Sequence, residues 1–169
     1  MISIHEGIGD DLDRIAWATL FSELVIKGRS VDGSIYRLYA ESLDSMEEDD
    51  VDRTAIYFLV HYLALSGLCG DYRVCPSCGR AFGDEEILGF STLTGTAVCR
   101  ECDNLDGTLI LPPNARKYLA RVFESSLEEA LSLGLSADAA RRISRNLLRS
   151  LRYVIPAPLK TLESGLLIG

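Results

Sequence analysis

Two pairs of cysteines constrain this 169-residue chain more than any other feature. Cys75 and Cys78 belong to a C-P-S-C-G motif, and Cys99 and Cys102 follow twenty residues later as C-R-E-C. Two residues between thiols let both sulfurs of a tight turn point at one ion, and two such turns supply a closed tetrahedral shell. Gly79 permits the sharp backbone turn after the first pair. We therefore expect these four cysteines to bind a structural Zn²⁺.

The segment that carries the cysteines, residues 75–102, has few aliphatic side chains for a core of its own. A bound metal would supply the missing stability, and apparent zinc binding of about 10–16 kcal/mol is of the right size. Four thiolates leave the ion no open position, so catalysis at the metal is not expected. An iron–sulfur cluster also takes four cysteines and stays open as an alternative. A redox centre at Cys75 and Cys78 is less favoured, because such pairs sit in a βαβ setting that this sequence lacks.

Helical periodicity dominates both sides of the cysteine segment. The expected helices cover residues 10–27, 34–46 and 52–66, then run from Pro113 onward, from a capping box at Ser125–Glu128 to Gly134, from Ser136 to Tyr153, and around Leu159–Leu166. The third is apolar nearly all round and should lie at the centre of a bundle. Short strands are expected around Ile87–Ser91 and Thr96–Val98, with a turn at Thr94-Gly95.

These elements predict a mainly α protein, a helical bundle with an inserted Cys₄ zinc-ribbon-like finger. We expect residues 1–70 to form the first helical part of one domain, residues 71–106 the zinc-finger insert, and residues 107–169 the second helical part. The composition, 47% hydrophobic and 25% charged, is ordinary for a soluble globular protein. The N-terminus carries no secretory signal and no apolar run reaches membrane-helix length, so we expect a cytoplasmic protein without membrane partners.

The remaining reactive side chains do not assemble a catalytic site in the sequence. The histidines are His5 and His61, and the second lies in the most apolar stretch, where a hydrogen-bonded core role is expected. No G-x-S-x-G, H-E-x-x-H or G-x-x-x-x-G-K-[ST] motif occurs. Cys69, outside both pairs, is expected to be a small buried apolar residue rather than a fifth ligand. We therefore expect a protein that is not an enzyme.

Charge is spread unevenly over the chain. The net charge is −8, yet residues 111–169 hold 5 acidic and 9 basic residues. At 100° per residue, the last long helix places one basic sector opposite its apolar side. That sector consists of Arg141, Arg142, Arg145, Arg149 and Arg152. It is either an ordinary solvated face or a dock for an anion, because guanidinium groups bind carboxylate and phosphate in bidentate fashion. The overall negative charge favours an acidic peptide over a phosphate backbone.

The order of motifs resembles one known family. Asp11 to Ala18 reads D-L-x-R-I-A-x-A, and the apolar stretch Tyr57–Leu65 follows. The two cysteine motifs enclose Gly89-Phe90-Ser91, and Leu159-Lys160-Thr161 stands where that family often carries L-K-S. From residue 10 onward the chain is similar to the C-terminal region of the RecO family of bacterial recombination and repair proteins.

The resemblance implies a non-enzymatic protein-interaction module of a recombination mediator in the RecF pathway, cytoplasmic and associated with the nucleoid during repair. RecO proteins act with RecR and load recombinase onto strands coated with single-stranded-DNA-binding protein (SSB). The family's helical region is implicated in holding the acidic C-terminal tail of SSB, which would suit the arginine sector. The family begins with an OB-fold, which binds single strands and which these 169 residues do not contain, so contact with single-stranded DNA is expected mainly there.

The alternative is a zinc finger that contacts nucleic acid directly. Arg73, Arg80 and Arg100 lie near the cysteines and would be the contacting residues, together with the arginines of the last long helix. The acidic residues of the same segment oppose this function, because they repel phosphates. They are Glu85, Glu86, Glu101 and Asp103.

Overall fold

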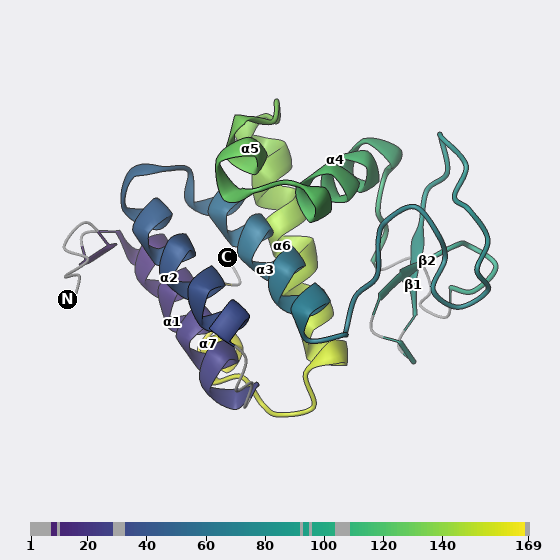
Figure 1. The fold of residues 1–169 in the computed structure, drawn as a ribbon. Coiled ribbons are helices and arrows are strands. Elements are labelled where there is room, and N and C mark those ends of the chain that lie inside the picture. The colour runs from purple at the N-terminus through teal and green to yellow at the C-terminus, as the bar shows by residue number, and fades with distance from the viewer. Residues whose placement is uncertain are drawn as a thin grey trace.

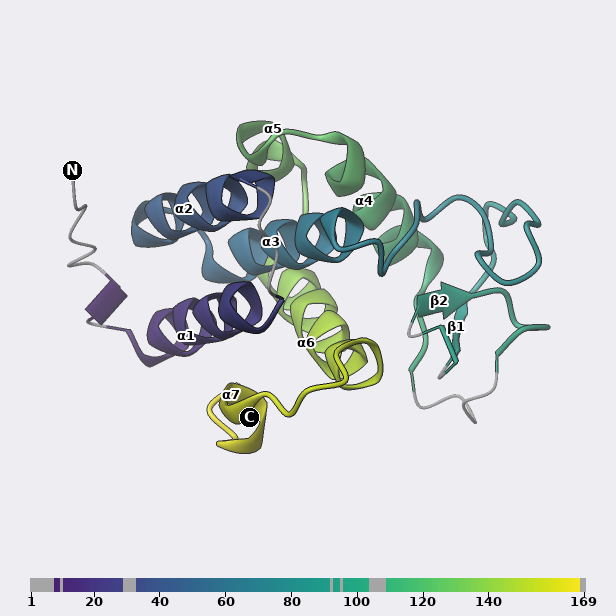
Figure 2. The ribbon, with the colours of Figure 1, turned by 60° about the horizontal axis from the view of Figure 1, so that its bottom comes forward.

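A bundle of helices carries a small cysteine-bearing insert at one end (Figure 1). The computed structural model describes residues 8–9, 11–28, 33–91, 93–94, 96–103 and 109–167. Its elements are α1 (Leu12–Lys27), α2 (Gly33–Glu48), α3 (Val51–Leu65), β1 (Gly89–Ser91), β2 (Thr96–Val98), α4 (Pro113–Glu124), α5 (Leu127–Ser132), α6 (Ala137–Val154) and α7 (Lys160–Glu163). The insert lies between α3 and α4, as Figure 2 shows from a second direction. The predicted mainly α fold with a small cysteine insert is confirmed.

Helix α3 forms the centre of the bundle, as its sequence predicts. It packs against α1, α2, α4, α5 and α6, so nearly all of its faces are covered. Its Phe58 ring stacks on Phe21 of α1 with centroids 3.8 Å apart and lies 5.7 Å from the Tyr62 ring. A helix surrounded on all sides needs apolar residues all round, which explains why α3 lacks a polar stripe.

The helices begin and end at residues that satisfy their free backbone groups. The Asp11 carboxylate accepts a hydrogen bond of 2.8 Å from the Asp13 N–H at the start of α1. Asp50 caps α3 in the same way, so the acidic run of residues 47–50 is divided between the end of α2 and the cap of α3. Helix α3 ends in a Schellman motif, because Gly67 has a φ of +69° and the Leu68 N–H bonds to the Leu63 carbonyl at 2.8 Å.

Two local sequence predictions need correction. The capping box of α5 is formed by Ser126 and Glu129, one residue later than expected, because the Ser125 backbone still closes the last turn of α4. Strand β1 begins at Gly89 and is shorter than expected, since Leu88 pairs with Leu111 across the insert's base instead. Gly95, expected at the hairpin turn, lies outside the described residues.

The insert is fastened to the bundle at three points. Strands β1 and β2 are antiparallel, and Phe90 of β1 packs on the Tyr153 ring of α6 with centroids 5.4 Å apart. The Asn146 side chain of α6 donates to the Ile110 carbonyl at 3.0 Å. The Arg116 side chain of α4, only 5% exposed, reaches into the insert and bonds to its backbone carbonyls. The hairpin is therefore held at a fixed place against α4 and α6.

The C-terminal segment folds back onto α1. The Glu23 carboxylate accepts hydrogen bonds from the backbone N–H groups of Lys160 (2.7 Å) and Thr161 (3.0 Å), which are the free donors at the start of α7. Burial raises the pKa of this carboxyl, but those hydrogen bonds and Lys27 outweigh it and lower the pKa to about 2. Over the described residues, no helix is long and apolar enough to cross a membrane.

Candidate metal centre and arginine surface

The first cysteine pair sits on a tight hairpin. The Cys75 N–H donates to the Arg80 carbonyl at 2.8 Å, and the Gly79 N–H donates to the Cys75 carbonyl at 2.8 Å. Gly79 has a φ of +75°, a conformation that side chains disfavour. The turn predicted from C-P-S-C-G is therefore present, and it brings both sulfurs to one side.

The second pair follows directly from strand β2. Cys99 comes after Val98, and the Cys102 N–H closes the turn on the Cys99 carbonyl at 2.9 Å. The turn is tied to β1 through Asp103, whose carboxylate accepts from the Phe90 N–H at 3.2 Å. The hairpin therefore delivers Cys99 and Cys102 to the first pair.

The four sulfurs have the spacing of ligands to a single ion. Within the described residues, the Sγ atoms of Cys75, Cys78, Cys99 and Cys102 lie within 4.8 Å of one another. Those of Cys78 and Cys99 are 3.8 Å apart. Four sulfurs placed about 2.3 Å from one tetrahedral ion would be separated by about 3.8 Å. The residues predicted from the sequence are thus brought together, and their donor set fits one metal ion.

The pKa shifts of the clustered thiols also favour a bound cation. Burial raises the pKa of the Cys75 thiol, but backbone N–H donors of Cys99, Cys78 and Ser77 outweigh it and lower the pKa to about 6. The contact with Cys99, followed by burial, raises the pKa of Cys102 to about 12. The thiols therefore oppose one another's ionisation, and a bound cation would let all four ionise together.

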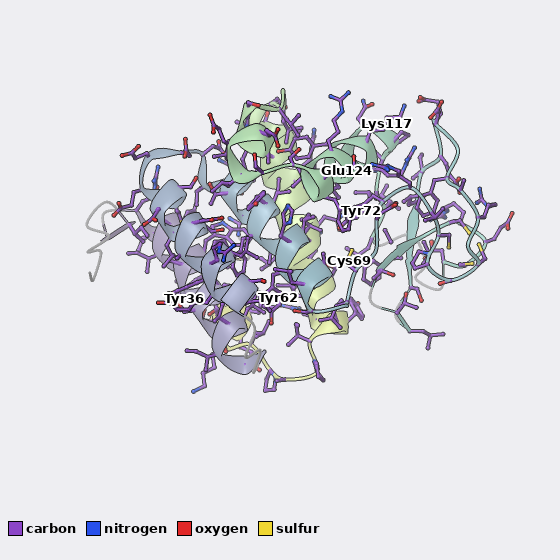
Figure 3. The ribbon with its side chains drawn as sticks, in the orientation of Figure 1. Tyr36, Tyr62, Cys69, Tyr72, Lys117 and Glu124 are labelled. Atoms are coloured by element: carbon purple, nitrogen blue, oxygen red, sulfur yellow. The ribbon has the colours of Figure 1, made fainter. Side chains whose placement is uncertain are left out.

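Cys69 stands apart from this cluster. Its thiol lies 3.3 Å from the Gly70 carbonyl and 3.5 Å from the Tyr72 hydroxyl, and burial raises its pKa. Figure 3 shows Cys69 and Tyr72 next to each other where α3 leads into the insert. This position agrees with the expected packing role, although Cys69 is only partly buried.

The five arginines of α6 are arranged as its periodicity predicts, but they do not form one uniform surface. Four of them are exposed, whereas the Arg145 side chain is only 22% exposed. Arg145 donates to the Leu167 carbonyl and lies 3.7 Å from the Asp13 carboxylate. Arg141 approaches Asp52 at 4.0 Å. The chain itself therefore engages two of the five guanidinium groups.

A hollow of about 400 Å³ lies along this face of α6. It is lined by Ile110, Arg141, Arg142, Arg145, Asn146 and Arg149. Arg152 lies outside it and borders a separate hollow beside the residues that follow α6. Arg142 and Arg149 form no ion pair with any residue that the structure describes, so both charges face solvent. The structure thus groups four of the predicted arginines and separates the fifth.

A narrow apolar cavity adjoins this hollow. It measures about 40 Å³ and lies between the β1–β2 hairpin and α6. Its walls include Phe90, Ala97, Leu111 and Leu147, and it shares Ile110 and Asn146 with the arginine-lined hollow. Sequence reasoning missed this cavity, because its walls come from separate segments that only the tertiary fold brings together.

Several other basic residues bind the chain's own backbone or carboxylates. Arg53 donates to the Leu131 carbonyl at 3.0 Å and also to the Leu135 carbonyl, which fixes the loop before α6. Sequence reasoning missed this role, and the one available sign is that Arg53 lies in the first turn of a mostly apolar helix. His61, by contrast, lies 3.0 Å from the Val122 carbonyl, and burial lowers its pKa, as a core role predicts.

The arginines near the cysteines are each paired with a carboxylate. Arg80 makes a two-pronged contact with Glu86, at 2.7 and 3.0 Å. Arg100 bonds to Asp103 at 2.7 Å. Arg73 pairs with Glu124, which lies on α4 together with Lys117 (Figure 3). These three cations are therefore already offset within the chain.

Comparison with known proteins agrees with this arrangement. A family model described as Recombination protein O C terminal matches residues 9–163. The DNA repair protein RecO of Desulfatibacillum aliphaticivorans is 30% identical over 148 residues, which cover 83% of this chain and 57% of that protein. The RecO protein of Caldanaerobacter subterraneus subsp. tengcongensis is 26% identical over 133 residues, covering 76% of this chain and 53% of that protein.

The chain spans just over half the length of these curated relatives. Comparison with solved structures gave no match. The family match covers both helical parts and the cysteine insert, so it does not depend on the cysteine motifs alone. The expected non-enzymatic character agrees with that family. Residues 9–163 are thus a RecO C-terminal domain, and the chain belongs to the RecO family of DNA recombination and repair proteins.

Proposed function

We propose that this domain is a non-enzymatic docking module that holds the acidic C-terminal tail of SSB during recombinational repair. The observation that carries the proposal is the arginine-lined hollow on α6, which opens beside an apolar cavity. An acidic peptide that ends in a hydrophobic residue needs both features next to each other. Its carboxylates would pair with the arginines, and its last side chain would pack against the apolar mouth of the cavity.

The charged half of this site rests on Arg142 and Arg149. Both guanidinium groups face solvent without an ion-pair partner among the described residues, so binding a carboxylate breaks no existing ion pair. Arginine binds a carboxylate through two parallel N–H donors, which adds orientation to the charge attraction. Arg141 and Arg145 line the same hollow and would add to its positive potential.

The apolar half rests on the position of the hairpin. Phe90 and Ala97 of the hairpin face Ile143 and Leu147 of α6 across the cavity. A side chain that covers the mouth of this cavity would remove apolar surface from water, which contributes about 25 cal/mol per Å². The hairpin must therefore stay in position for the apolar half of the site to exist. A metal ion bound by the four cysteines would contribute to docking indirectly, by holding the hairpin.

We propose that the bound ion is Zn²⁺ and that its function is structural. The support is the closed set of four sulfurs, the 3.8 Å Cys78–Cys99 separation and the lack of a free ligand position. An iron–sulfur cluster holds several metal ions and sulfides, so it would space its cysteine ligands more widely. Zinc would hold the hairpin that forms one wall of the cavity.

RecR is a further proposed partner, since the RecO resemblance implies it, and we assign it no surface. Single-stranded DNA is proposed to contact mainly the family's OB-fold. Direct DNA binding by the cysteine insert is the weaker alternative. Arg80 and Arg100 already pair with Glu86 and Asp103, and a phosphate would have to displace those carboxylates.

The experiment is a binding titration with a labelled SSB tail peptide, followed by fluorescence anisotropy. The Arg142→Glu/Arg149→Glu variant should weaken binding about tenfold or more, because two attractive contacts become repulsive. A matched control, Arg37→Glu/Arg121→Glu, makes the same charge change at exposed sites on α2 and α4 and should bind like the wild type. A peptide whose last residue is glycine should also bind more weakly. Equal affinity of the two variants would refute the proposed site.

A further inference from the structure

We propose that the chain's own C-terminal segment, residues 155–167, competes with the acidic peptide for Arg145 and so restrains the docking site. This inference rests on the proposed function. It starts from the fact that Arg145 lines the arginine hollow and is at the same time held by the C-terminal segment. Figure 2 shows that this segment crosses from the end of α6 back toward α1 and carries α7 there.

Three polar contacts and three buried leucines, Leu159, Leu162 and Leu167, hold the segment in place. Glu23 binds the start of α7, Lys27 donates to the Pro158 carbonyl, and Arg145 donates to the Leu167 carbonyl. The Leu167 side chain is fully buried, with 0% exposure, whereas its neighbour Leu166 is 58% exposed. Leu167 thus anchors the segment next to Arg145. Arg145 is the arginine of the hollow that bonds to the segment.

Arg145 is held in a conformation that satisfies it within the chain. Its guanidinium pairs with Asp13 at 3.7 Å and lies 5.8 Å from the centre of the Trp17 ring. The Leu167 carbonyl and the Asp13 carboxylate occupy donors that a peptide carboxylate would need. A peptide can recruit Arg145 fully only when these contacts open.

The cost of that opening lowers the apparent affinity of the site. An affinity measured for a protein that is only fractionally in its binding-competent state is reduced by that fraction. If Arg145 is released about one tenth of the time, freeing it permanently would tighten peptide binding about tenfold. The segment would therefore act as an intramolecular competitor, with Arg142 and Arg149 providing the first contacts of the peptide.

The test compares two variants that add the same charge at neighbouring positions. Leu167→Asp places a carboxylate in a fully buried position, so the end of the segment beyond α7 should leave its seat and release Arg145. Leu166→Asp adds the same charge at an exposed position and should leave the segment docked. Trp17, the only tryptophan of the chain, reports the change, because its ring lies close to the Arg145 guanidinium. Circular dichroism melting checks that both variants stay folded.

We expect Leu167→Asp to shift the Trp17 emission and to bind the acidic peptide about tenfold more tightly than Leu166→Asp. In the wild type, the peptide itself should shift the emission as it recruits Arg145. Equal affinity of the two variants, with the emission shifted only in Leu167→Asp, would overturn the competition while leaving the docking site intact. Absence of peptide binding in all three proteins would instead overturn the docking function, and the competition with it.

Discussion

Replacing Arg116 by methionine should loosen the cysteine insert from the helical bundle. Arg116 projects from α4 and is 5% exposed. Its side chain donates to the Gly83 carbonyl at 2.9 Å, with longer bonds to the carbonyls of Asp84 (3.3 Å) and Tyr72 (3.4 Å). The guanidinium also lies 5.8 Å from the centre of the Phe82 ring. One side chain therefore joins α4 to two separate stretches of the insert.

The expected loss follows from these contacts. A hydrogen bond from a charged donor contributes about 1.5–3 kcal/mol. Only the Gly83 bond has near-optimal length, so the two longer bonds should add little. Methionine keeps the aliphatic volume near Phe82 but supplies no donor. We therefore expect the free energy of unfolding to fall by about 1.5–3 kcal/mol.

The assay is urea unfolding of the zinc-loaded protein, followed by circular dichroism. Arg121→Met is the matched control, because Arg121 lies on the same helix and is exposed. It should change the free energy of unfolding by less than about 0.5 kcal/mol. A loss below about 1 kcal/mol in Arg116→Met would refute the conclusion that this residue fastens the insert.

Three further changes test separate parts of the structure. Gly89→Ala should destabilise the insert, because a Cβ atom there would lie 2.3 Å from the Asp103 carboxyl group. The rate of proteolysis within the insert would measure this loss of stability, and Ser91→Ala is a milder change in the same strand. Cys99→Ser should abolish tight zinc retention, measured by a chelator dye, and a stoichiometrically metal-bound variant would contradict the four-sulfur shell. Glu23→Gln should cost about 2 kcal/mol at pH 7, since the pKa of Glu23 is lowered from 4.5 to about 2. That difference in the free energy of unfolding should shrink as the pH falls from about 4.5 toward 2. A difference independent of pH would refute the role of the ionised Glu23 carboxylate at α7.

Much of the fold follows from local sequence patterns. The apolar periodicity of α3 reflects a helix covered on all sides, and the sequence correctly places the end of α3 before Gly67 and the cap of α6 at Ser136. The capping box was predicted one residue early because Ser125 and Ser126 are adjacent serines with acidic residues three positions later. The way the preceding helix ends decides which of two adjacent serines becomes the cap, and that end depends on tertiary packing.

The candidate site was only partly predictable, for a physical reason. The cysteine ligands follow from spacing alone, because a two-residue gap and a tight turn are local. The arginine sector follows from helical periodicity, but the partners of Arg145 do not. Asp13 and Leu167 are distant in sequence, and only the fold brings them to α6. The apolar cavity likewise depends on the packing of the hairpin against α6.

The most direct test of the docking function is an NMR titration of the ¹⁵N-labelled, zinc-loaded protein with the acidic SSB tail peptide. The docking site predicts saturable shift changes centred on Arg142, Asn146 and Arg149 of α6 and on Ile110, with smaller changes in β1 and β2. Changes centred instead on α4 or on the cysteine turns, or no saturable change at millimolar peptide, would contradict the assignment of this surface.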